Sequence, residues 1–199
     1  MDLELDNLLQ RLQELEEEFE RKAAEHRAAL EYRVENGRVV FTRAILDEHR
    51  QIRQSVIQFL RQSTVGGILI APLVYVLILP FVLLDLGVWV YQSVCFAVWG
   101  IAPVRRGNYI VLDRHHLAYL NGIEKLNCLY CGYANGLIAY VREVAARTEQ
   151  YWCPIKHAVR TRGTHARHRQ FVDYGDGAAF RARLENLRAD VRHARREGL

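Results

Sequence analysis

Residues 65–104 read VGGILIAPLVYVLILPFVLLDLGVWVYQSVCFAVWGIAPV, with Asp85 as the single charged residue. A run this long and this apolar indicates a membrane segment. As one straight helix it would measure about 60 Å, roughly twice the thickness of the hydrocarbon layer of a membrane. Pro80 and Gly87 lie close to Asp85, so we expect the chain to turn there and form a two-helix transmembrane hairpin over residues 64–104. A re-entrant wedge that does not cross the membrane is the alternative.

Arginines flank this segment on both sides. Because positive residues are retained in the cytoplasm, we expect both termini there, at an inner or plasma membrane. A cytoplasmic location keeps thiols reduced, which favours metal-ligating or reactive cysteines over disulfides. The flanking arginines are Arg50, Arg53 and Arg61 before the segment, and Arg105, Arg106 and Arg114 after it.

Residues 1–35 are predicted to form an amphipathic or coiled-coil arm, because apolar residues recur there at steps of three and four. The arm either packs on its own chain or forms a homo-oligomer. After Asn36-Gly37 interrupts the pattern, residues 36–63 are predicted to form a juxtamembrane helix. The apolar residues of the arm are Leu5, Leu8, Leu12, Leu15 and Phe19.

Residues 105–199 are predicted to form a basic cytoplasmic domain. From Val104 onward there are 17 Lys and Arg against 9 Asp and Glu. This charge favours the anionic lipid headgroups of the bilayer as partners, whereas no nucleic-acid-binding motif is present. The densest basic patch, RTRGTHARHRQF at residues 160–171, could bind phosphate of any origin, with a solvated or lipid-facing loop as the default.

Two amphipathic helices are predicted in this domain. One covers residues 133–152 and begins near Asn135 or Gly136, and the other covers residues 175–197 with Asp176 as its N-cap. The stretch NYIVLD at residues 108–113 is predicted to form a short strand.

Four residues of this domain have the spacing of a metal site. Cys128 and Cys131 form C-x2-C, and Cys153 and His157 form C-x3-H. If the helix between the two pairs returns the chain to its start, the four residues can form a tetrahedral Cys3His site, which favours structural zinc over iron. A redox pair of Cys128 and Cys131 and simple burial of the cysteines are the alternatives. Cys95, inside the apolar segment, is excluded from the site.

A second metal site for iron or manganese is weighed against ordinary salt bridges such as Glu143 to Arg147. No catalytic motif is recognisable, so the sequence does not favour an enzyme. The candidate ligands of this second site are His115 and His116 with Asp113, Glu124, Glu143 and Glu149.

The sequence therefore predicts a mainly α membrane-anchored protein, with a coiled-coil arm, a transmembrane hairpin and a small helical metal-knuckle domain. Its predicted function is that of a cytoplasm-facing interaction or scaffold protein. One alternative is a membrane-bound iron or thiol redox protein that uses the same cysteines. The other is an oligomeric channel or transporter subunit, for which Asp85 and Gln92 give little support.

Overall fold

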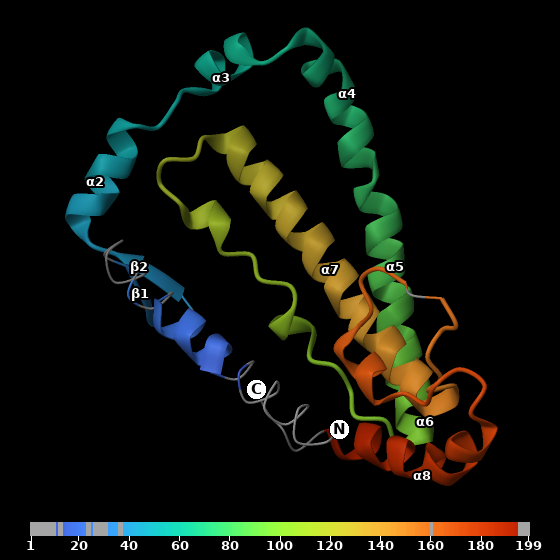
Figure 1. Ribbon diagram of the computed structural model, residues 1–199. Helices are drawn as coiled ribbons and strands as arrows, with labels where there is room; N and C mark the ends of the chain where they lie inside the picture. Colours follow the sequence, from blue (N-terminus) through green and yellow to red (C-terminus); the bar gives the residue numbers. More distant parts are fainter. Residues whose placement is uncertain are drawn as a thin grey trace.

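The computed structural model describes residues 11, 14–22, 25, 32–35, 38–159 and 161–194, and it is mainly helical. A long rod of helix runs down one side, and α7 (Gly122–Trp152) lies beside it (Figure 1). Residues 100–121, which we call the return segment, leave the end of the rod and run back along α7, which lies between them and α4 in this view. The last helix, α8 (Gly177–His193), lies across the end where the rod and α7 meet.

The rod is one continuous helix from Val65 to Trp99, which we call the apolar helix. It consists of α4 (Val65–Val76), α5 (Ile78–Tyr91), the π-helical η1 (Gln92–Phe96) and α6 (Ala97–Trp99). Among the described residues it is the one helix that is long and apolar enough to cross a membrane. The predicted turn at Asp85 is therefore wrong, because the chain passes through Asp85 and Gly87 as helix.

Pro80 explains the local irregularity of the apolar helix. Proline has no N–H to bond to the carbonyl of Val76, and the helical pattern is interrupted at Leu77, just before it. The interruption is small, since Leu77 keeps right-handed helical dihedral angles. The helix ends at Gly100, whose φ of 71° is left-handed and suits a glycine C-cap.

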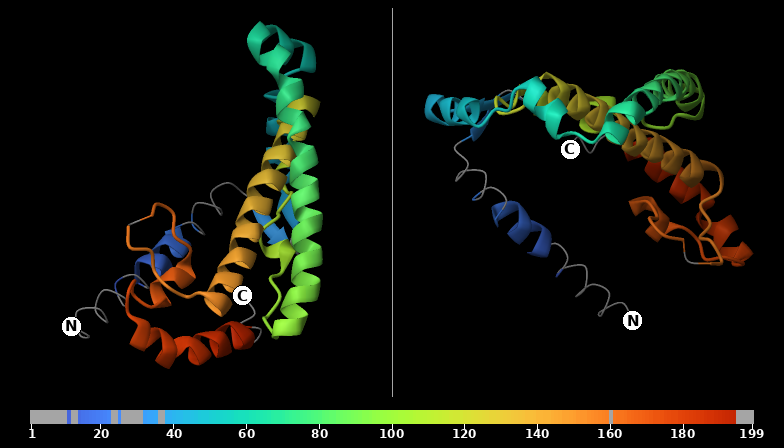
Figure 2. Two further views of the ribbon diagram at one scale, coloured as in Figure 1. Left: turned by 90° about the vertical axis from the view of Figure 1, so that its right-hand side faces the viewer. Right: turned by 90° about the horizontal axis from the view of Figure 1, so that it is seen from above.

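The prediction that both termini lie in the cytoplasm assumed a two-helix hairpin, and residues 65–99 form a single helix instead. A continuous helix that crosses a membrane has its two ends on opposite sides, and the two groups of flanking arginines then lie at different ends of one rod. The left view of Figure 2 shows the rod along its length, and the chain does not turn back within it.

α7 begins at Gly122, 13 or 14 residues before the predicted start at Asn135 or Gly136. Asn121 accepts hydrogen bonds from the backbone of Ile123 and Glu124, and Glu124 bonds back to the N–H of Asn121. This capping box fixes the first turn, so the helix includes Cys128 and Cys131. For α8 the prediction is confirmed, because Asp176 is its N-cap and accepts from Ala179 N–H at 2.9 Å.

The predicted strand at residues 108–113 does not form, since this part of the return segment pairs with no strand. It lies instead over two glycines of α7. A Cβ on Gly136 would lie 2.6 Å from the carbonyl oxygen of Tyr109 and 2.9 Å from the Cα of Ile110. A Cβ on Gly132 would meet Leu112 at 3.3 Å. The Gly-x-x-x-Gly spacing thus makes a groove that the extended backbone occupies.

The core lies where the C-terminal half of the apolar helix meets the return segment, α7 and α8. The buried groups come from all four elements, which explains how a chain with so much exposed apolar surface still has a defined interior. The cluster contains Phe96, Ile101, Val104, Leu137, Tyr140, Val144 and Val191.

The region before the apolar helix differs from the prediction. Residues 36–63 do not form one helix, because β1 (Tyr32–Glu35) and β2 (Arg38–Phe41) pair as an antiparallel hairpin, followed by α2 (Arg43–Gln51) and α3 (Val56–Gln62). Asn36-Gly37 between the strands is a strong hairpin signal. Of the predicted arm, Leu5, Leu8 and Leu12 lie outside the described residues, whereas Leu15 and Phe19 belong to the helical stretch 14–22 and are exposed.

Candidate functional site

One face of the apolar helix carries four polar side chains that bond to α7 or to the return segment. We call this set of contacts the polar seam. Its members on the apolar helix are Tyr75, Asp85, Tyr91 and Gln92.

Asp85 makes the central contacts of the polar seam. Arg106 donates from Nε to Oδ1 at 3.1 Å and from Nη2 to Oδ2 at 2.6 Å, and Tyr133 donates to Oδ2 at 3.0 Å. The Asp85 carboxylate is 14% exposed, against 47% for the Arg106 side chain. Burial, followed by the contact with Asp85, raises the pKa of the Tyr133 phenol, which therefore stays protonated and donates at neutral pH. The carboxylate is fully paired within the chain.

Gln92 fastens the return segment to the apolar helix. Its Oε1 accepts from Val104 N–H at 2.8 Å, and its Nε2 donates to the Val104 carbonyl at 3.3 Å. The amide side chain thus satisfies one residue of extended backbone completely, as a neighbouring strand would. Gln92 opens the π-helical turn η1, and such turns commonly re-aim side chains at functional positions.

The two ends of the polar seam are phenols that contact α7. Tyr75 donates to the amide oxygen of Asn127, and the Tyr91 hydroxyl lies 2.9 Å from that of Thr148. Half-buried residues of the apolar helix recur along the same face at helical spacing: Ala71, Tyr75, Ile78, Phe81, Asp85, Val88, Gln92, Cys95 and Trp99.

Most of the remaining side chains of the apolar helix are exposed and apolar. Leu69, Leu83 and Val98 are between 70% and 77% exposed, and no residue of the most apolar window is buried. Contiguous apolar surface of this extent is rare on a monomeric soluble protein.

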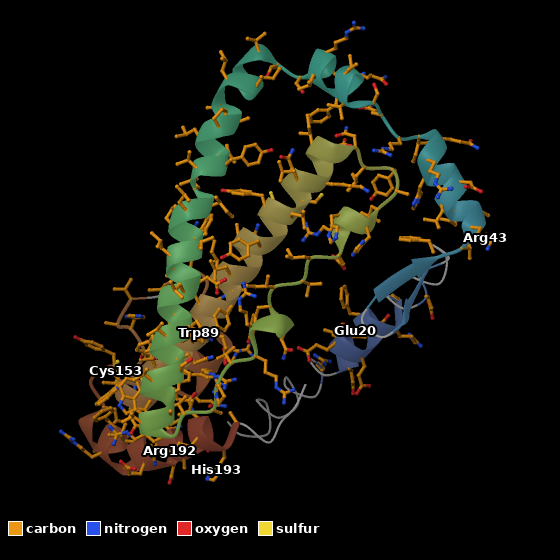
Figure 3. All side chains as sticks on the ribbon, turned by 180° about the vertical axis from the view of Figure 1, so that it is seen from behind. Glu20, Arg43, Trp89, Cys153, Arg192 and His193 are labelled. Atoms are coloured by element: carbon orange, nitrogen blue, oxygen red, sulfur yellow. The ribbon has the colours of Figure 1, made fainter. Side chains whose placement is uncertain are left out.

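An aromatic and basic cluster covers the end of the apolar helix. The Trp99 ring stacks on Tyr151 at 5.8 Å and meets Trp152 edge-on at 5.3 Å. Arg192 donates to the Trp99 carbonyl at 3.2 Å, and its guanidinium lies 5.3 Å from the centre of the Tyr151 ring. Arg188 lies over the same ring at 5.1 Å. Figure 3 labels Arg192 and Trp89 at this end of the molecule.

The predicted Cys3His site is not assembled. Cys128 and Cys131 lie inside α7, whereas Cys153 is its C-cap, so 21 residues of helix lie between Cys131 and Cys153 and hold them about 33 Å apart. Figure 3 labels Cys153 near Trp89, at the far end of α7. Residues 153–157 are not helical either, because Ile155 forms a bridge with Val172. A single zinc or iron ion does not fit these four residues.

Of the second set of predicted ligands, the three glutamates make salt bridges or a helix cap, whereas Asp113, His115 and His116 lie in or beside the short 3-10 turn η3 (Arg114–His116). Glu143 accepts hydrogen bonds from Arg147 at 2.9 Å and from Arg167 at 3.0 Å. The bond from Arg147 is the salt bridge that the sequence predicted as the alternative to a metal site. Glu149 pairs with His165 at 2.8 Å. In the described part of the chain, no three His, Cys, Asp or Glu side chains are grouped closely enough to hold a metal ion.

Sequence reasoning missed the partners of the polar seam on α7, which are Asn127, Tyr133 and Thr148. One signal in the sequence could have indicated that the apolar helix has a polar face: Asp85 and Gln92 are seven residues apart and therefore lie on the same side of a helix. No family model, curated protein or solved structure matches the chain.

Proposed function

We propose that this protein is a membrane-anchored interaction protein, in which the apolar helix lies in lipid and supports a basic region at the membrane surface. The observation that carries the proposal is the division of the apolar helix into two faces. Asp85 and Gln92 turn inward to partners, and the leucines and valines turn outward. A surface helix of a water-soluble protein has the reverse arrangement. Lipid is the solvent that favours outward apolar and inward polar groups.

The cluster at the end of the apolar helix supports the same proposal. Trp and Tyr side chains are enriched at membrane–water interfaces, and arginines beside them can reach the headgroups. Trp99 and Trp152 lie at this end together with Arg192. The residues that follow are basic, and each well-placed cation adds about 1 kcal/mol of attraction to an anionic membrane.

The other two candidate functions receive less support. A redox protein that uses Cys128, Cys131 and Cys153 together would need them close to one another, and α7 separates them. A channel would need unpaired polar groups along a path, whereas Asp85 and Gln92 are paired with Arg106 and Val104.

Lipid contact of the exposed face is tested by fluorescence quenching. In a variant without native cysteines, a fluorophore is attached to cysteine at Leu73 or Leu83, and the protein is placed in vesicles. Both positions are exposed, at 67% and 70%, and Val159, at 77%, is the matched apolar control outside the apolar helix. We expect nitroxide-labelled lipid to quench positions 73 and 83, and aqueous iodide to quench position 159. Equal iodide quenching at all three positions would refute the anchor.

A further inference from the structure

A basic cleft lies in the loop that follows α7. It has a volume of about 600 Å³, and its described lining consists of His157, Val159, residues 161–164 and His168 of η4 (Ala166–Gln170). Its described lining contains a guanidinium, two imidazoles and two threonine hydroxyls, and no Asp or Glu. The polar lining residues are His157, Thr161, Arg162, Thr164 and His168.

Backbone contacts hold this loop in place. Gly163 has a φ of 71°, which permits a tight turn, and Arg142 of α7 donates to its carbonyl at 2.6 Å. At the start of the loop, the backbone N–H of Lys156 donates to the carbonyl oxygen of Val172 at 2.7 Å. The N–H of Val172 donates to the carbonyl oxygen of Pro154 at 2.9 Å. The cleft is therefore formed before any ligand arrives, which lowers the entropic cost of binding.

The charges beside the cleft leave Arg162 available. Lys156 pairs with Asp173, and Arg167 pairs with Glu143, so these neighbours are neutralised. Arg162 makes no ion pair or hydrogen bond with the described residues and is exposed. A free guanidinium beside hydroxyl groups is the donor arrangement that phosphate oxygens accept from.

His168 forms part of the cleft wall. Its Nε2 is enclosed and has no hydrogen-bond partner in the described part of the chain. Because this atom is covered, a ligand in the cleft does not reach it without a turn of the ring. The His157 ring lies nearly parallel to that of His168, with centres 6.1 Å apart, so both imidazoles belong to the same cleft.

We infer that this cleft is a binding site for a phosphate group, with Arg162 as its charged ligand and the threonine hydroxyls as further donors. The group is either a free phosphate ester or the headgroup of an anionic lipid, and the two present the same oxygens. This inference concerns a site outside the apolar helix and stands independently of the proposed anchor.

Phosphate binding by the full-length protein in neutral detergent tests the inference, with isothermal calorimetry as the readout and inorganic phosphate as the probe. Arg162→Gln is compared with Arg169→Gln, which removes the same charge from η4 at a position that does not line the cleft. We expect Arg162→Gln to weaken binding about tenfold or more, because a charge-assisted pair is lost, and Arg169→Gln to change it less than about twofold. Neither residue is buried, so both variants should fold.

Two arms separate the sources of the phosphate. Binding of inorganic phosphate in detergent indicates a soluble ester. If it is absent, phosphatidylcholine vesicles with and without phosphatidylglycerol are compared, and a gain with phosphatidylglycerol that Arg162→Gln removes and Arg169→Gln keeps indicates a lipid headgroup. No binding in either arm, or equal losses in the two variants, would overturn the inference. Because the detergent arm needs no membrane contact, it separates a failure of this site from a failure of the anchor.

Discussion

Asp85 and Arg106 form a two-bond ion pair across the polar seam, between a carboxylate that is mostly covered and a guanidinium that reaches it from the return segment. Removing Arg106 would leave a mostly covered carboxylate without its charge complement, and removing Asp85 would leave a half-exposed guanidinium without its acceptor. The pair therefore couples the apolar helix to the rest of the fold.

The Asp85→Asn variant should be less stable than the native protein by about 1–3 kcal/mol in neutral detergent, because Arg106 loses its charged acceptor. The free energy of unfolding measures this loss. Asp47→Asn is the control, since its pair with Arg50 is exposed at 65% and 67% and should contribute less than about 1 kcal/mol. Equal losses in the two variants would show that the ion pair has no special role.

Gly136→Ala should destabilise the protein by about 1–3 kcal/mol, because its Cβ would enter the backbone of Tyr109 and Ile110. Gly122→Ala, in the same helix, is the control, since a Cβ there meets nothing within 4 Å. Thermal unfolding in detergent compares the two variants. A Gly136→Ala variant as stable as the control would mean that the return segment does not lie on this groove.

Alkylation of Cys153 should be slow at neutral pH. Burial, and then the charge of Glu149, raises the pKa of its thiol, so less thiolate is present at a given pH. In a variant that keeps only this cysteine, the rate with iodoacetamide should rise at higher pH than in the same protein unfolded in denaturant. Glu149→Gln should move the folded profile part of the way back. Coincident folded and unfolded profiles would contradict this reading.

Continuity of α7 predicts the separation of its cysteines. Spin labels on Cys131 and Cys153, with Cys95 and Cys128 replaced, should lie about 33 Å apart by pulsed electron resonance. Coordination of one metal ion would instead place both sulfur atoms within about 4 Å of each other. A short distance would show that the chain returns to its start between the two residues, as the Cys3His site requires, and would contradict the structure.

Composition predicted the apolar helix, because an apolar run of this length is a property of the residues themselves. Its path was not predictable from the run alone. A single charged residue in an apolar run, such as Asp85, suggests a turn. In the structure Asp85 stays within the helix because its carboxylate pairs with Arg106, 21 residues later in the return segment. That pairing is tertiary information, which local propensity does not contain.

The cysteine prediction failed for a similar reason. The spacing C-x2-C is compatible with a knuckle and also with adjacent turns of one helix, and the capping box at Asn121 and Glu124 selects the helix. That signal was legible in the sequence as N-x-x-E, as was the hairpin signal Asn36-Gly37. At Asp176 no cysteine motif suggested another structure, and the N-cap residue alone was enough to predict where α8 begins.

The distance between residues 66 and 98 in lipid nanodiscs tests the central claim most directly, which is that the apolar helix is continuous. Spin labels are attached to Gly66→Cys and Val98→Cys in a variant without native cysteines. Both sites accept a label, because a Cβ at Gly66 meets nothing within 4 Å and Val98 is 77% exposed. A continuous helix predicts a separation of about 48 Å, and a hairpin that turns at Asp85 would give less than about 20 Å and contradict the structure.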